Sequence, residues 1–230
     1  MSAEYWKSHY DAAGLEPGLS LLQQVGKTVH GKPVSEEQID LIVNGICRNL
    51  QLDRCDSVLD LCCGNGLLTS RLAPIVDRIT GIDYSQRLIE IANIRNAARN
   101  VTYLCRNILE LDEMQYAHAD KILMYEALQH LSVLDCHGLA DMLRKTRPGT
   151  CALIASIPDR AQLGTYYNTQ EKMDFYNRCE RENRPHMGRW WLREEVAEIA
   201  DAHGLSMRPL EQDPRLYTAY YRFDVLLGNP

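Results

Sequence analysis

The sequence predicts a doubly wound α/β fold, in which helices cover both faces of a mostly parallel sheet. Short β-rich runs alternate with helical patterns along residues 36–157. Strands that alternate with helices pair in parallel through right-handed crossovers. The length of 230 residues suffices for one α/β core with a small cap, but not for two domains of ordinary size. We therefore expect one domain.

The elements follow in order along the chain. A helix is predicted over residues 36–50, because Ser35 and Gln38 form a capping-box pattern and apolar residues then recur at helical spacing. Strands are expected at residues 57–62, 78–82, 101–105, 121–125 and 151–157, with helices at 67–72, 86–98 and 133–144. The sequence Arg147-Pro148-Gly149 ends the last of these helices.

The C-terminal third departs from this alternation. A helix is expected over residues 192–203, followed by β-rich runs at 205–210 and 217–227 with a turn at Asp213-Pro214 between them. Two strands joined by a turn predict an antiparallel hairpin.

Composition and charge exclude several functional classes. The formal net charge is -6 and the basic residues are scattered, so we expect no nucleic-acid partner. The N-terminus lacks a signal-peptide pattern and no apolar run approaches membrane-spanning length, which predicts a cytoplasmic protein without a membrane partner. The eight cysteines include no Cys-x-x-Cys pair, and the adjacent Cys62 and Cys63 are poorly spaced as metal ligands, so reduced thiols and no metal site are expected.

The segment Val58-Leu59-Asp60-Leu61-Cys62-Cys63-Gly64-Asn65-Gly66-Leu67-Leu68 places an acidic residue near the end of a strand and a Gly-rich turn before a helix. Gly64 and Gly66 lack side chains, so the main chain can approach a ligand closely. Asp83 follows the next strand, near the ~20-residue spacing at which a carboxylate accepts hydrogen bonds from ribose hydroxyls. A helix N-cap is a compatible second role for Asp83.

This pattern resembles the first motif of class I S-adenosylmethionine-dependent methyltransferases of the small-molecule type, and the resemblance extends over about residues 38–157. It implies a Rossmann-like, seven-stranded sheet whose last strand is antiparallel, with S-adenosylmethionine as cofactor and S-adenosylhomocysteine as product. Asp60 is implied to lie near the ammonium and sulfonium of the cofactor. The chain departs from the family pattern where Cys62 and Leu68 replace the usual first and last glycines.

The same resemblance assigns the rest of the cofactor site. Asn107 stands where the family commonly has an aspartate that accepts from the adenine amino group, and Ile108 can pack on the purine; an ordinary Asx turn is the alternative for Asn107. The expected cofactor-binding residues are Asp60, Cys62, Gly64, Asn65, Gly66, Asp83, Tyr84, Asn107, Ile108 and Met124.

The reaction site is expected where the fourth strand ends. His130 is the leading candidate for a general base, because an ordinary imidazole accepts a proton near neutral pH. Glu126 is a second candidate, and a structural histidine is the alternative for His130. Lys27 is expected to be a solvated surface residue.

We expect a single methyltransferase domain over residues 1–230, with a lid at 1–34, including a loop at 26–33, and an aromatic substrate cap at 159–191. Its expected function is methyl transfer to an oxygen or nitrogen atom of a small-molecule metabolite, by a monomer or homodimer. One alternative is a non-catalytic interaction protein with the same fold. A NAD(P)-dependent oxidoreductase is another, although its fingerprint calls for Gly or Ala where this chain has Thr69.

Overall fold

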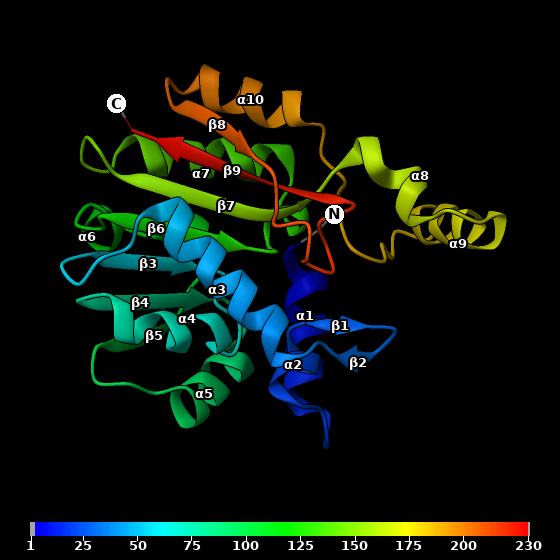
Figure 1. Ribbon diagram of the computed structural model, residues 1–230, viewed down its shortest axis with the longest axis horizontal. Coiled ribbons are helices and arrows are strands. Elements are labelled where there is room, and N and C mark those ends of the chain that lie inside the picture. The colour runs from blue at the N-terminus through cyan, green and yellow to red at the C-terminus, as the bar shows by residue number, and fades with distance from the viewer. Residues whose placement is uncertain (1–2, 230) are drawn as a thin grey trace.

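A seven-stranded sheet forms the centre of the computed structural model, which describes residues 3–229 (Figure 1). Its strand order is β5-β4-β3-β6-β7-β9-β8. The strands are β3 (Ser57–Leu61), β4 (Arg78–Asp83), β5 (Val101–Cys105), β6 (Lys121–Tyr125), β7 (Cys151–Pro158), β8 (Ser206–Leu210) and β9 (Arg222–Gly228). Strands β3 to β7 pair in parallel, and β9 is antiparallel to both β7 and β8. The predicted α/β sheet with an antiparallel last strand is confirmed.

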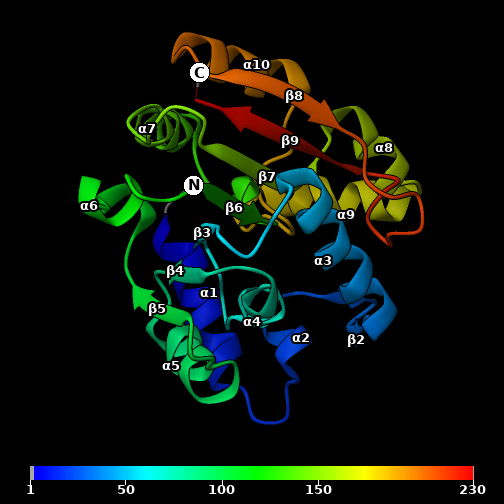
Figure 2. The same cartoon turned by 60° about the vertical axis from the view of Figure 1, so that its left-hand side comes forward.

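Helices cover both faces of the sheet, as the alternation of elements predicted (Figures 1 and 2). On one face, α3 (Glu36–Leu50) and α4 (Leu67–Leu72) pack with Val58, Ile79 and Leu123 of the strands. On the other, α7 (Val133–Arg144) and α10 (Arg193–Ala202) bury Leu139 and Val196. The helix α5 (Gln86–Arg95) packs against β5, and the short α6 (Glu113–Tyr116) precedes β6.

Two further segments lie at the end of the sheet where the parallel strands finish (Figure 1). The N-terminal one comprises α1 (Ala3–Leu15), α2 (Leu21–Gln24) and a hairpin of β1 (Thr28–Val29) and β2 (Lys32–Pro33). The other comprises α8 (Leu163–Tyr166) and α9 (Gln170–Arg181), which project beyond the sheet. Met1 and Ser2 of the expected lid lie outside the described residues.

Four details of the elements differ from the sequence predictions. Ser35 is the N-cap of α3 but makes no side-chain cap bond, and the backbone N–H of Gln38 donates to the Ser35 carbonyl instead. The Gln38 side-chain amide bonds the backbone of Arg215 and Tyr217. The helix expected to reach residue 98 ends at Arg95. The expected loop at 26–33 contains a hairpin, and the strand expected from residue 217 begins only at Arg222.

Gly66 permits the close packing of the Gly-rich turn against β5. Its φ is +76°, and a Cβ there would lie 2.4 Å from the Tyr103 hydroxyl. We expect Gly66→Ala to destabilise the fold by about 1–3 kcal/mol, through strain and overpacking, in urea unfolding. Gly45→Ala is the matched control, because Gly45 lies inside α3 with open space around it. Equal stability of the Gly66→Ala variant and the wild type would contradict this packing role.

Candidate active site

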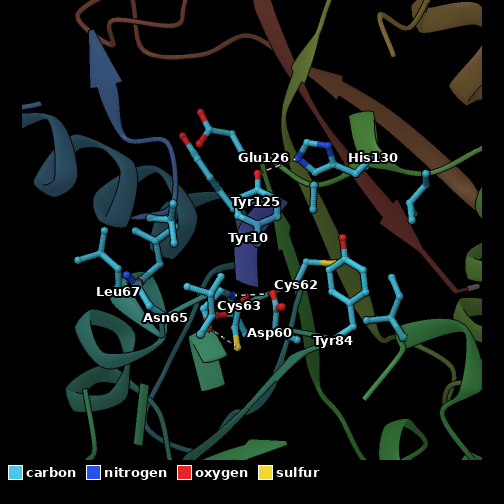
Figure 3. A pocket seen from close by; sticks show the side chains of 18 of the residues that line it. Tyr10, Asp60, Cys62, Cys63, Asn65, Leu67, Tyr84, Tyr125, Glu126 and His130 are labelled. Atoms are coloured by element: carbon cyan, nitrogen blue, oxygen red, sulfur yellow. Dashed lines mark hydrogen bonds between the residues drawn. The ribbon is translucent and has the colours of Figure 1, made fainter. Parts of the chain in front are cut away.

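A deep pocket lies where β3, β4 and β6 end, next to the N-terminal segment (Figure 3). Its free space, open mouth included, is about 1070 Å³. Tyr10, Val25 and Lys27 of the N-terminal segment contribute to its wall. The wall also contains these expected site residues: Asp60, Cys62, Gly64, Asn65, Asp83, Tyr84, Asn107, Ile108, Glu126 and His130.

Two of the expected cofactor residues do not line this pocket. Gly66 faces Tyr103, and Met124 is fully buried in the core on the α7 side of the sheet. Because side chains alternate between the two faces of a strand, the end of β6 directs Met124 into the core rather than into the pocket. Met124 therefore does not line the pocket, and its contact with the cofactor stays a prediction.

Asp83 holds the Gly-rich turn against the end of β4. Its carboxylate accepts hydrogen bonds from the backbone N–H groups of Gly64 and Ser85, each at 2.9 Å. Only 5% of the residue is exposed, and burial raises the pKa of its carboxyl to about 6. Each carboxylate oxygen has a second lone pair, so both can accept a further bond from a ligand.

Asp60 lies on the adjacent strand and is 3% exposed. It accepts a hydrogen bond from the Thr69 hydroxyl at 2.6 Å. Burial raises the pKa of this carboxyl to about 7 against the opposing effect of that bond, and the charge of Asp83 adds to the rise. Within residues 3–229 no cationic side chain forms an ion pair with Asp60 or Asp83. Buried carboxylates of this kind suit a cationic, hydroxyl-bearing ligand.

Backbone strain is concentrated at this edge of the sheet. Cys62 follows β3 with a φ of +58°, and Glu126 follows β6 with a φ of +56°. This left-handed conformation costs a non-glycine residue roughly 1–2 kcal/mol, and such residues cluster at functional sites. Burial raises the pKa of the Cys62 thiol well above its usual value, so Cys62 lines the pocket as a neutral group.

Asn107 forms the Asx turn that was the alternative to an adenine contact. Its amide oxygen accepts from the backbone N–H of Leu109 at 3.1 Å, and its amide nitrogen donates to Glu110. The turn leaves one lone pair of the amide oxygen for a ligand. Ile108 is buried in the wall beside it.

Lys27 is not the surface residue that the sequence suggested. It is only 4% exposed, its ammonium forms an ion pair with Glu126, and it lies 4.5 Å from the centre of the Tyr125 ring. Burial lowers the pKa of Lys27. Burial alone would raise the pKa of Glu126, but Lys27 and Arg222 outweigh it and lower that pKa. Glu126 is thus an ionised partner of Lys27 and a poor candidate for a base.

His130 and Tyr10 face each other in the pocket wall, with the His130 Nε2 3.1 Å from the Tyr10 hydroxyl (Figure 3). The imidazole also packs on the Trp6 indole, with ring centres 4.1 Å apart. Burial, reinforced by Arg222 and His9, lowers the pKa of His130 to about 3, so the ring is neutral at pH 7. Its Nδ1 is buried and has no partner among the described residues.

Sequence reasoning did not pair Tyr10 with His130. Tyr10 and Trp6 are four residues apart, the spacing of one helix face, and this was the available signal for α1. The residue that this helix face contacts could not be predicted from the neighbouring sequence, because His130 is far away along the chain.

Comparison with known proteins identifies the sequence around this pocket. A model described as "Methyltransferase domain" matches residues 58–149. Residues 58–149 are therefore similar in sequence to a methyltransferase domain. Over 76 residues, 32% of the chain and 31% of the relative, it is 32% identical to the ubiquinone biosynthesis O-methyltransferase of Idiomarina loihiensis. It is 31% identical over 115 residues to the 23S rRNA (uracil(1939)-C(5))-methyltransferase RlmD of Paraburkholderia xenovorans, covering 45% of the chain and 24% of that protein.

Solved structures confirm the Rossmann-like fold of this chain. Magnesium protoporphyrin IX methyltransferase from Synechocystis PCC 6803, crystallised with bound S-adenosylhomocysteine, superposes with a TM-score of 0.63 at 14% identity, over 99% of this chain and 97% of that one. By contrast, the matched segments span only between 10% and 34% of the length of the curated relatives. Similarity over so short a part does not identify the substrate of this chain.

Three further features of the described chain bear on the sequence predictions. Within residues 3–229 no helix is long and apolar enough to cross a membrane. All eight cysteines are free. In the same described range, no group of three His, Cys, Asp or Glu side chains is arranged to hold a metal ion.

Proposed function

We propose that this protein transfers a methyl group from S-adenosylmethionine to an oxygen or nitrogen atom of a small-molecule acceptor. The single observation that carries the proposal is the pair Asp60 and Asp83. These two buried carboxylates have no cationic partner in the described chain, and they line one pocket at the ends of adjacent parallel strands. A ligand with a ribose and a cationic amino-acid end supplies what both carboxylates lack.

The other residues of the pocket fit the remaining parts of this cofactor. Asp83 would accept from the ribose hydroxyls and Asp60 would lie near the cationic end. Asn107 and Ile108 would contact the adenine. Gly64 leaves no room for a side chain, because a Cβ there would lie 2.9 Å from the Val25 side chain, and this keeps its backbone at the pocket surface.

When bound, S-adenosylmethionine would supply an electrophilic methyl group on its sulfonium, and the thioether sulfur would keep the electrons of the C–S bond when the acceptor lone pair bonds to the methyl carbon. The chain must align the acceptor, exclude water and remove a proton. His130 can orient the acceptor by accepting a hydrogen bond, whereas its pKa of about 3 makes it a weak base for the proton itself. In the tautomer whose Nε2–H donates to Tyr10, the neutral imidazole has a free lone pair on Nδ1. Trp6 and Tyr10 fix the orientation of the ring.

A small molecule is favoured over RNA as the acceptor by charge. Some relatives are named as RNA methyltransferases, but the matched segments span only 10% and 24% of those proteins. The chain carries a net charge of -6, whereas proteins that bind a phosphate backbone neutralise it with clustered basic residues.

Incubation with methyl-labelled S-adenosylmethionine tests the acceptor class. One reaction contains a small-metabolite extract and the other contains total RNA from the same cells. We expect label in the metabolite fraction only. Label in the RNA would contradict a small-molecule acceptor, and absence of label from both would contradict methyl transfer itself.

The affinity for S-adenosylhomocysteine should depend on pH, because its ammonium and ribose need ionised carboxylates. As the pH falls from 8 to 5.5, protonation of Asp60 near 7 and of Asp83 near 6 should weaken binding, by up to about tenfold per pH unit for each group. Calorimetry at several pH values measures this dependence. Asp60→Asn should bind more weakly at pH 8 and show a flatter profile. A constant wild-type affinity over this range would contradict the assignment.

The same pKa shifts set the pH dependence of stability in the ligand-free protein. Folding raises both carboxyl pKa values, so the native state binds more protons than the unfolded chain. Their contribution is fully present below pH 4 and is lost as the pH rises through about 7. Asp60→Asn should therefore raise the melting temperature of the ligand-free protein at pH 8 but hardly at pH 4.

A further inference from the structure

We propose that a second hollow, next to the cofactor pocket, binds an uncharged acceptor with a flat aromatic ring. This proposal rests on the proposed function and names the class of its substrate. The hollow, here called the tyrosine cleft, has a free space of about 2070 Å³ with its open mouth included. Three segments that are distant in the sequence line it: the β1–β2 hairpin with His30, the cap with Tyr166 and Phe175, and the loop before β9 with Tyr217 and Tyr220.

The arrangement of the rings in the tyrosine cleft favours a planar guest. The rings of Tyr166 and Tyr220 are nearly parallel, with an angle of 13° between them and 6.4 Å between their centres. Tyr221 is tilted against both, at 4.6 and 4.7 Å. Tyr220 is nevertheless 53% exposed, so much of its surface is open to the cleft and solvent. Aromatic rings stack at centre separations of roughly 4.5–7 Å, so an aromatic guest can pack on Tyr220 and Tyr166.

The tyrosine cleft and the cofactor pocket share a wall. Lys27 lines the pocket, and the residues that follow it directly, Thr28 to His30, line the cleft. The wall is held by the Lys27–Glu126 ion pair with Tyr125 beside it. A ring in the cleft therefore lies beside the cofactor pocket, with its body among the tyrosines and this wall between it and the methyl donor.

Charge in the tyrosine cleft favours a neutral ring over a charged one. Its carboxylates, Glu171 and Asp174, are equal in number to its Lys and Arg side chains, Lys172 and Arg178, so their formal charges cancel. Lys172 is bonded to Asn168, Asp174 is bonded to Gln170, and Arg178 lies over the Phe175 ring. The hydroxyl of Tyr167 is likewise occupied by His186. The walls thus offer mainly aromatic faces, together with the Tyr217 hydroxyl, which has no hydrogen-bond partner among the described residues.

Calorimetry with 2-naphthol and its saturated counterpart 2-decalol tests the proposal on protein saturated with S-adenosylhomocysteine. We expect saturable binding of 2-naphthol and much weaker binding of 2-decalol, which has a similar size but no aromatic face. Equal binding of the two, or none of either, would overturn the proposal. Binding of S-adenosylhomocysteine in the same samples separates this outcome from a failure of the proposed function.

Variants of Tyr220 locate the binding. Tyr220→Leu should weaken 2-naphthol binding between about twofold and tenfold, the effect of losing one aromatic contact, whereas Tyr220→Phe should retain it. Leu134→Ala is the control, since Leu134 is 79% exposed at the start of α7 and does not line the cleft. Unchanged binding by Tyr220→Leu would place the aromatic site elsewhere. All three variants should bind S-adenosylhomocysteine like the wild type, which also shows that they are folded.

Discussion

Replacement of Glu126 by glutamine is expected to lower the free energy of unfolding by about 3–5 kcal/mol, because it leaves the Lys27 ammonium buried without an anionic partner. Lys27 is almost completely buried, and its ammonium forms an ion pair with the Glu126 carboxylate. The pair also joins the N-terminal segment to the end of β6. Urea unfolding at pH 7, followed by circular dichroism, measures the change.

A double variant separates the loss of the partner from the loss of packing. Lys27→Met combined with Glu126→Leu removes both buried charges, and should recover most of the stability that Glu126→Gln loses. Surface pairs give a further comparison: Glu36→Gln, which breaks an exposed pair with Arg71, should cost less than about 1 kcal/mol. If Glu126→Gln is as stable as the wild type, the ion pair does not hold the N-terminal segment.

Replacement of Asp83 by alanine is expected to weaken S-adenosylhomocysteine binding by ~1.5–3 kcal/mol, the range for losing a hydrogen bond to a charged group. Two effects act together. The variant loses the proposed acceptor of the ribose hydroxyls, and it frees the backbone N–H groups of Gly64 and Ser85 that now bond Asp83. Calorimetry at pH 8, where the carboxyl is ionised, measures the loss.

Asp77→Ala is the matched control for Asp83→Ala. Asp77 directly precedes β4 at its opposite end, is largely exposed, and does not line the pocket. It should leave the affinity unchanged. Equal affinities of the Asp83→Ala variant and the wild type would mean that the ribose lies elsewhere.

The fold and the centre of the cofactor pocket were predictable because their signals are local. Strands alternating with helices fix a parallel sheet, and the carboxyl ends of neighbouring parallel strands meet at one edge. Asp60, the Gly-rich turn and Asp83 had therefore to converge, and Asp60, Gly64 and Asp83 line one pocket. The residue types alone were sufficient to predict this part of the pocket, because the backbone geometry of the parallel sheet positions these residues.

The remainder of the site depends on contacts between distant segments. Lys27 looked like a surface residue because nothing in its neighbourhood shows that it meets Glu126, 99 residues away. Tyr10 and His130 are 120 residues apart. Residues 217–221 are β-rich in composition, but they form a loop in which Tyr220 and Tyr221 pack against Tyr166 of the cap, and the strand begins only at Arg222. Tertiary packing decides each of these positions, and a single sequence does not encode it in any local pattern.

Equilibrium dialysis of the folded wild-type protein against radiolabelled S-adenosylhomocysteine at pH 8 tests the central claim most directly. If Asp60 and Asp83 form a cofactor pocket, the protein will retain the ligand at one saturable site, and unlabelled S-adenosylmethionine will displace it. Equal ligand concentrations on both sides of the membrane, with protein shown to be folded by circular dichroism, would contradict the account.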